Sequence, residues 1–187
     1  ELPFERVPAV QKRIIRMANE IGKPVITATQ MMESMIDSPS PTRAEATDVY
    51  NAVRDGTDAI MLSAETSIGR HPFRAVQAMT KIAKRAERYL EYSMLADRRR
   101  HVASKGGLEV DDSIAHSAGV VAASLKAKAI IAFTESGSTA GRVASYRPIT
   151  PLLALTTKFS AGAKLSLRWG VIPITVNHYD EIQAMFH

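Results

Sequence analysis

Short apolar runs alternate with segments of helical periodicity along most of this chain, and this alternation constrains the fold more than any other feature. Each run is rich in Val, Ile, Leu or Ala and leads through a polar loop into an amphipathic stretch. Such an order is typical of α/β proteins with parallel sheets. We expect strands over residues 25–29, 59–63, 129–134, 152–156 and 171–176. We expect helices over residues 7–21, 43–54, 72–92, 111–125, 139–146, 161–169 and 180–186. Helical spacing places Ile14 on the apolar face of the first of these helices and Phe73 on that of the third.

The helical and strand periodicity breaks off between residues 93 and 110. Charged residues cluster there, and two consecutive glycines interrupt any helix. We therefore predict a linker over 93–110 between two domains, 1–92 and 111–187. The dense basic run at 98–101 has almost no neighbouring aromatic side chains for base stacking, so we interpret it as solvated linker and predict no nucleic-acid partner.

Composition excludes several classes of protein. The 187 residues include no cysteine, which rules out disulfides and thiolate metal sites. No apolar run is long enough to span a membrane and the start does not resemble a signal peptide, so we expect a cytoplasmic protein without a membrane partner. The net charge of +5 is compatible with phosphorylated ligands but does not select them.

Polar side chains stand at the end of the first expected strand. Thr27, Thr29 and Gln30 occupy the position where α/β proteins often carry their chemistry. Threonine also favours strands for purely structural reasons, so both interpretations remain open. Thr42 and Glu45 have the spacing of a capping box that begins the next helix, in which Arg43 and Asp48 read as solvated surface charges.

Two later loops have the composition of anion-binding loops. Residues 63–69 join a strand to a helix, and Glu65 in this loop is expected to order it rather than to act as a base. The second loop offers hydroxyl groups and a glycine before a short helix, which fits either a phosphate cradle or ordinary turn chemistry. Its residues are Thr134, Ser136, Gly137, Ser138 and Thr139. The spacing of a nucleoside-triphosphatase P-loop is absent, and the five histidines show no ligand spacing.

Three gapless blocks, residues 24–36, 41–49 and 55–66, closely resemble consecutive blocks of the pyruvate kinase family. The resemblance continues through 134–139 and 146–148. It implies an α/β fold: the last two βα units of a TIM (β/α)8 barrel, then a three-layer α/β regulatory domain with a mostly parallel sheet. It also implies that the chain is truncated at both ends, with three strands of a sheet that has five in the family.

The resemblance implies the glycolytic transfer of a phosphoryl group from phosphoenolpyruvate to ADP, giving pyruvate and ATP. The family uses Mg²⁺ and, in many members, K⁺. Its two metal-binding carboxylates and its catalytic lysine lie on earlier strands of the barrel, and the resemblance places the K⁺ ligands outside this chain as well. We therefore expect no catalytic or metal-binding residue within this chain and no activity from it alone. Thr29 matches the family's substrate-contacting threonine. Ile68 stands where a nucleotide-contacting lysine is common.

The resemblance also implies partners. Arg43 and Asp48 match positions at the contact between barrels of neighbouring subunits, which implies a homotetramer. Residues Thr134, Ser136, Gly137, Ser138 and Thr139 match the loop that grips the phosphate of an allosteric effector. Glu135 stands where members activated by fructose 1,6-bisphosphate often have lysine, so a monophosphorylated effector, or none, is expected. The alternative is a non-catalytic phosphate-sensing or oligomerisation module.

Overall fold

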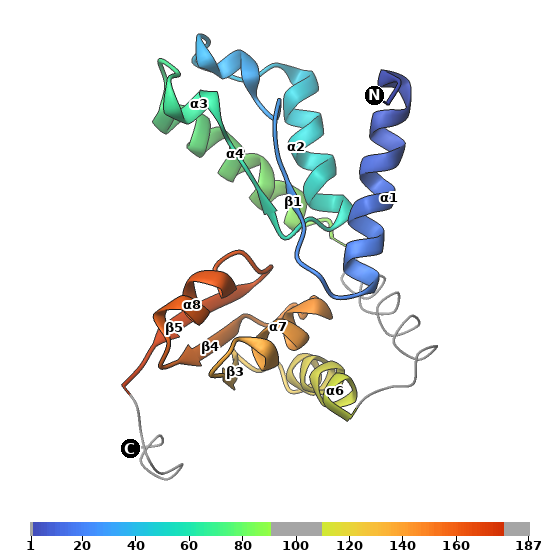
Figure 1. Cartoon of the computed structure of the whole chain (residues 1–187), viewed down its shortest axis with the longest axis vertical. Coiled ribbons are helices and arrows are strands. Elements are labelled where there is room, and N and C mark those ends of the chain that lie inside the picture. Colours follow the sequence, from blue (N-terminus) through green and yellow to red (C-terminus); the bar gives the residue numbers. More distant parts are fainter. Residues whose placement is uncertain (1, 91–109, 178–187) are drawn as a thin grey trace. The chain divides into compact units, whose positions relative to one another are not determined.

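The computed structural model describes residues 2–90 and 110–177, which belong to two compact units, 1–95 and 96–187 (Figure 1). Each unit contains helices and a small parallel sheet, so the predicted α/β class is confirmed. The basic run at 98–101, nearly all of the expected linker at 93–110 and the expected helix at 180–186 lie outside the described residues.

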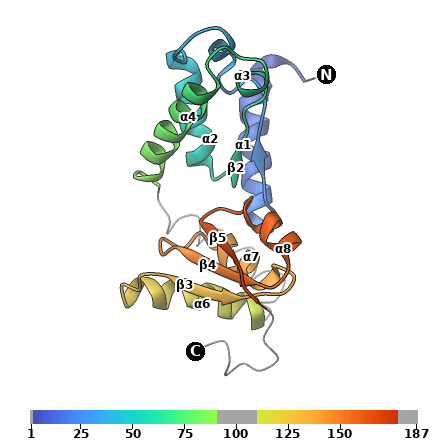
Figure 2. The ribbon, with the colours of Figure 1, turned by 90° about the vertical axis from the view of Figure 1, so that its left-hand side faces the viewer.

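The first unit repeats a strand–helix order around a two-stranded parallel sheet. In the register, Ile26 lies opposite Ala59 and Thr27 opposite Ile60. The strands are shorter than expected, because the chain turns away soon after Thr27. The elements are η1 (Phe4–Arg6), α1 (Val7–Glu20), β1 (Ile26–Thr27), η2 (Glu33–Ile36), α2 (Arg43–Asp55), β2 (Ala59–Ile60), α3 (Ala64–Ser67) and α4 (Pro72–Glu87); β2 is labelled in Figure 2.

Local signals define both ends of α2. The capping box predicted from Thr42 and Glu45 is confirmed: the Thr42 hydroxyl accepts from the Glu45 backbone N–H at 3.2 Å, and the Glu45 carboxyl accepts from the Thr42 N–H at 2.7 Å. At the other end Gly56 adopts φ 98°, a left-handed conformation that glycine tolerates without a steric penalty. These contacts satisfy backbone groups that a helix terminus would otherwise leave unpaired.

A methionine-rich core holds the first unit together. The turn after β1 contributes Met31, Met32 and Met35, which pack between α2 and α4. The partners on those helices are Val49 and Ala52 on α2 and Ala75 and Met79 on α4. Flexible, unbranched methionine side chains fill such an irregular space well. The methionine-rich stretch is therefore mainly core.

Two expected helix faces differ from the structure. In α1 the buried residue is Ile15, whereas Ile14 is 54% exposed. In α4 the burial expected for Phe73 is wrong, because its side chain is 85% exposed while Ala75 is fully buried. Helical periodicity defines an apolar face but not which part of it meets a neighbour, and α4 packs through its small residues against α2.

Side chains add to the backbone hydrogen bonds that join β1 to β2. The Thr57 hydroxyl lies between the strands, within 3.0 Å of the Val25 carbonyl oxygen and 2.9 Å of the Ala59 carbonyl oxygen. It accepts from the Thr27 N–H at 3.2 Å and from the Thr27 hydroxyl at 3.0 Å. Asp58 adds a carboxyl oxygen that accepts from the Val25 N–H at 3.0 Å. Residues 57 and 58 therefore hold the start of β1 in place.

The second unit is a three-stranded parallel sheet in the order β3–β4–β5. Its elements are α6 (Val110–Ser124), β3 (Ile130–Phe133), α7 (Ser138–Ser145), β4 (Leu152–Thr156), α8 (Phe159–Leu165) and β5 (Val171–Thr175). The core lies between one sheet face and these helices: Ala132, Leu152, Ala154 and Val171 meet Ala115 of α6, Val143 of α7 and Leu165 of α8. On the opposite face Ile131 and Ile172 are exposed, so the described residues cover one face of the sheet (Figure 2).

Candidate functional site

Thr29 and Gln30 form an exposed, strained corner directly after β1. Their φ angles are 70° and 55°, in the left-handed region that residues other than glycine rarely adopt. Such residues cost about 1–3 kcal/mol each and persist only where their surroundings fix them. The Thr29 hydroxyl donates to the neighbouring Ala28 carbonyl at 2.6 Å. Thr27, in contrast, is 7% exposed and its hydroxyl is used by Thr57, so it has a structural role.

Glu65 connects the loop after β2 to the turn after β1. Its side chain is 3% exposed; Oε1 accepts from the Met32 N–H at 3.1 Å and Oε2 from the Ser63 N–H at 2.7 Å. A second link lies nearby, because the Arg70 N–H donates to the Ile36 carbonyl at 2.7 Å. The two loops at the carboxyl ends of the parallel strands therefore form one connected surface, and the geometry of Glu65 agrees with a loop-ordering role.

Glu45 holds the same turn from the side of α2. Besides capping the helix, its carboxyl oxygens accept from the Ser34 N–H at 2.7 Å and from the Ser34 hydroxyl at 2.5 Å. Burial alone would raise the pKa of Glu45, but the hydrogen bonds from Ser34 and Thr42 outweigh it and hold this pKa below its ordinary value. The sequence predicted the capping box and missed the link to Ser34, since no local pattern marks a contact across eleven positions.

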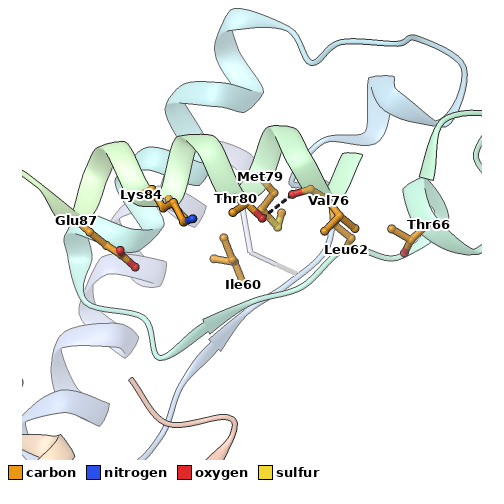
Figure 3. A pocket seen from close by; sticks show the side chains of 9 residues that line it. Ile60, Leu62, Thr66, Val76, Met79, Thr80, Lys84 and Glu87 are labelled. Atoms are coloured by element: carbon orange, nitrogen blue, oxygen red, sulfur yellow. Dashed lines mark hydrogen bonds between the residues drawn. The ribbon is translucent and has the colours of Figure 1, made fainter. Parts of the chain in front are cut away.

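An open groove of about 530 Å³ lies between β2 and α4 (Figure 3). Its lining is mostly apolar, with Ile60, Leu62 and Met79 on its walls. Lys84 and Glu87 stand toward one end; burial raises the pKa of Glu87, and Lys84 offsets part of that rise. The groove does not include Thr29 and offers a single cation, so its chemistry does not fit a multiply charged phosphate.

The loop after β3 gathers hydroxyl groups at the start of α7. Gly137, with φ 92°, donates its N–H to the Thr134 hydroxyl at 3.0 Å, and the Ser138 N–H donates to the Ser136 hydroxyl at 3.3 Å. Ser136, Ser138 and Thr139 are exposed, whereas Thr134 is buried. Backbone N–H groups at a helix start favour an anion, but here the loop's own hydroxyls already occupy two of them.

Glu135 forms an ion pair that the sequence did not indicate. Its Oε1 lies 2.5 Å from Nζ of Lys158, which follows β4. Both side chains are largely exposed, so the pair contributes little to stability. It nevertheless places a cation beside the loop at 134–139. Only the parallel pairing of β3 with β4 brings the two residues together.

The remaining candidate residues are exposed. Arg43 and Asp48 both lie on the surface of α2, and Ile68 is 77% exposed just after α3. Thr29 belongs to the first unit and the loop at 134–139 to the second.

Within residues 2–90 and 110–177, no three acidic or histidine side chains converge as a metal site would require. The described residues therefore do not fit the Mg²⁺ that the resemblance implies. Of the helices in these same stretches, none has the length and apolar character needed to cross a bilayer.

Family models match both units. The model described as pyruvate kinase, barrel domain, matches residues 1–76, and the model described as pyruvate kinase, alpha/beta domain, matches residues 112–187. The predicted succession of a barrel end and an α/β domain is thereby confirmed.

Individual proteins agree with the family models. The chain is 51% identical over 175 residues to a pyruvate kinase of Sporosarcina psychrophila, covering 93% of this chain and 29% of that protein. It is 48% identical over 174 residues to one of Clostridium acetobutylicum, covering 93% and 36%. A crystal structure of a pyruvate kinase from Cryptosporidium parvum superposes with a TM-score of 0.95 at 41% identity, over all of this chain and 38% of that one. The chain spans about a third of the length of the curated relatives that it matches.

Proposed function

The chain belongs to the pyruvate kinase family, and we propose that it contributes one wall of a site that transfers a phosphoryl group from phosphoenolpyruvate to ADP, giving pyruvate and ATP in glycolysis. The observation that carries this proposal is the match of both family domains in their order, at about half identity to proteins named pyruvate kinase. The corner at Thr29 supplies the local chemistry.

Thr29 is proposed to bind the phosphoenolpyruvate end of the site. Its hydroxyl is exposed, and its only hydrogen bond shown within the described residues is to the adjacent Ala28 carbonyl, which a small rotation of the side chain would release. The left-handed backbone presents the side chain at the carboxyl edge of β1. A positioned hydroxyl would align the substrate, and alignment is a large part of catalysis in phosphoryl transfer.

Mg²⁺, K⁺ and the catalytic lysine are proposed to be held by parts of the family's barrel that this chain does not match. This is supported by the lack of a converging acidic set among residues 2–90 and 110–177. No step of the reaction is therefore assigned to a metal bound by these residues. The proposed contribution of this chain is to hold and orient substrate.

A chimera tests the proposed function. The 187 residues would replace the matched segment in the Clostridium acetobutylicum pyruvate kinase, and ATP formation would be followed by coupling pyruvate release to lactate dehydrogenase. We expect Mg²⁺-dependent turnover within about tenfold of the parent enzyme, because the exchanged segments are 48% identical over 174 residues. The 187 residues alone are expected to give no turnover.

The unmodified Clostridium acetobutylicum enzyme and a reaction with chelated Mg²⁺ serve as controls. A chimera that folds, by circular dichroism, and shows no turnover would contradict the proposal and favour a non-catalytic phosphate-sensing or oligomerisation module. Turnover by the 187 residues alone would contradict the assignment of the catalytic lysine and metal ligands to other parts of the barrel.

From the same family membership we propose that the protein forms a homotetramer in the cytoplasm. Arg43 and Asp48 lie exposed on α2, as a contact between the barrels of neighbouring subunits requires. Light scattering on the chimera, with and without Arg43→Glu, measures whether four chains associate and whether this residue takes part.

We also propose 1–92 and 111–187 as the domains and 93–110 as their linker.

The loop at 134–139 is proposed to bind the phosphate of an effector. Support comes from its exposed Ser136, Ser138 and Thr139 hydroxyls at the start of α7 and from Lys158 beside it. Glu135 places a negative charge at the same loop, which favours a monophosphorylated sugar or nucleotide over a bisphosphate. This regulatory role adds to the proposed enzymatic one.

Calorimetry on the 187-residue chain tests the effector loop. With Glu135→Gln, fructose 1,6-bisphosphate is expected to bind roughly three- to tenfold more tightly, because one repulsive charge is lost and Lys158 is released from its pair. A sugar monophosphate should gain less. Equal, tight binding of the bisphosphate to both forms of the chain would contradict the proposed preference.

A further inference from the structure

We propose that Glu65 is a positioning residue for the substrate site: it fixes the turn after β1 and thereby the strained corner at Thr29 and Gln30. This inference rests on the proposed function, because it concerns the group that would hold phosphoenolpyruvate. It adds a residue that makes no contact with substrate and acts through the backbone.

The geometry of the Glu65 carboxyl group shows a clamp between two loops. Its two oxygens each accept a backbone N–H, one from Met32 and one from Ser63, and these residues follow different strands. The side chain is 3% exposed, so water does not compete for either bond. A buried carboxyl group that accepts hydrogen bonds from two backbone amides fixes the two loops that carry those amides relative to each other.

The corner at Thr29 and Gln30 spans the short distance between two fixed points. On one side Thr27 is held by the Thr57 hydroxyl through both its N–H and its own hydroxyl. On the other side Met32 is held by Glu65, and Ser34 by Glu45. With both ends held, the residues between them are forced to turn sharply, which accounts for two consecutive left-handed residues that are not glycine.

Glu65 reaches this position through a tightly packed loop. A Cβ atom at Gly69 would lie 2.4 Å from the Glu65 carbonyl oxygen, so only glycine permits the close return of the chain after α3. A purely structural role in this loop is the competing explanation. It predicts a general loss of stability, whereas positioning predicts an effect specific to phosphoenolpyruvate.

Glu65→Gln separates the two explanations, because glutamine keeps the size of the side chain and has one acceptor oxygen in place of two. In the chimera, the KM for phosphoenolpyruvate is expected to rise about tenfold, while the KM for ADP stays within about twofold. The matched control is Glu33→Gln, the same change at an exposed side chain of the same turn. Its KM values should equal those of the unmodified chimera.

Amide hydrogen exchange on the 187-residue chain supplies a readout that does not depend on activity. Glu65→Gln should lower the protection factor of the Met32 or the Ser63 amide about tenfold, and Glu33→Gln should leave both protection factors unchanged. Equal changes in both KM values, or an unchanged KM for phosphoenolpyruvate, would overturn the positioning role. An inactive parent chimera beside lost amide protection would instead show that the proposed function had failed while the clamp exists.

Discussion

Thr29→Val in the chimera is expected to lower kcat/KM for phosphoenolpyruvate by about 10- to 100-fold. A hydrogen bond to a charged group contributes about 1.5–3 kcal/mol, and valine removes the hydroxyl while keeping the branched shape of threonine. Because both side chains are branched at Cβ, the steric cost of φ 70° is similar in the two proteins, although valine also loses the bond to the Ala28 carbonyl. The measured loss therefore reports the hydroxyl group.

Thr29→Ser is the matched control, since it restores the hydroxyl and removes only a methyl group. Its kcat/KM is expected to stay within about threefold of the parent value. Initial rates at varied phosphoenolpyruvate and saturating ADP give both parameters. A Thr29→Val chimera with unchanged kcat/KM would contradict a substrate contact at this position, and the exposed corner would then have no assigned ligand.

Thr57→Val is expected to destabilise the first unit by about 2–3 kcal/mol. The Thr57 hydroxyl is the meeting point of contacts with Val25, Thr27 and Ala59, and its residue is 2% exposed. Valine would leave the Thr27 N–H and hydroxyl without this acceptor in a buried place, and each unsatisfied buried group costs about 1–3 kcal/mol. The residues around position 57 should relax in the variant, which makes the total loss of stability smaller than the sum of the two separate costs.

Urea titration of the 187-residue chain, followed by NMR signals of the first unit, measures this loss. Thr80→Val is the matched control, because Thr80 is exposed and its hydroxyl donates to the Val76 carbonyl one turn earlier in α4; a change within about 0.5 kcal/mol is expected. Trp169, the single tryptophan, lies in the second unit, and its fluorescence transition should stay unchanged. A Thr57→Val protein as stable as the Thr80→Val protein would contradict the role of Thr57.

Features that depend on neighbouring residues were predicted well from the sequence. The helix expected over 43–54 is observed as Arg43–Asp55, because the capping box at its start and the glycine at its end act within one turn. Strand positions were also found, but their lengths were overestimated in the first unit. Strand ends depend on pairing with another strand, and the apolar run at 25–29 carries no information on where that pairing stops.

Features that depend on distant residues were missed. No pattern connects Glu65 with Met32, Glu45 with Ser34 or Glu135 with Lys158, although each contact shapes a candidate site. The exposed face of α4 at Phe73 was missed for the same reason, since the burial of an apolar residue depends on what packs against it.

Thr27 and Thr29, at the end of the first expected strand, show which properties follow from the sequence and which depend on the tertiary structure. The sequence by itself determined the family, the α/β order and a polar strand end, because composition, periodicity and long gapless blocks are local properties of the chain. The strand pattern did not distinguish Thr27 from Thr29, which are equally polar and two positions apart, and only the family resemblance singled out Thr29. The tertiary structure separated their environments: Thr57, thirty residues after Thr27, binds Thr27 in the interior through its hydroxyl, whereas Thr29 is exposed with a left-handed backbone.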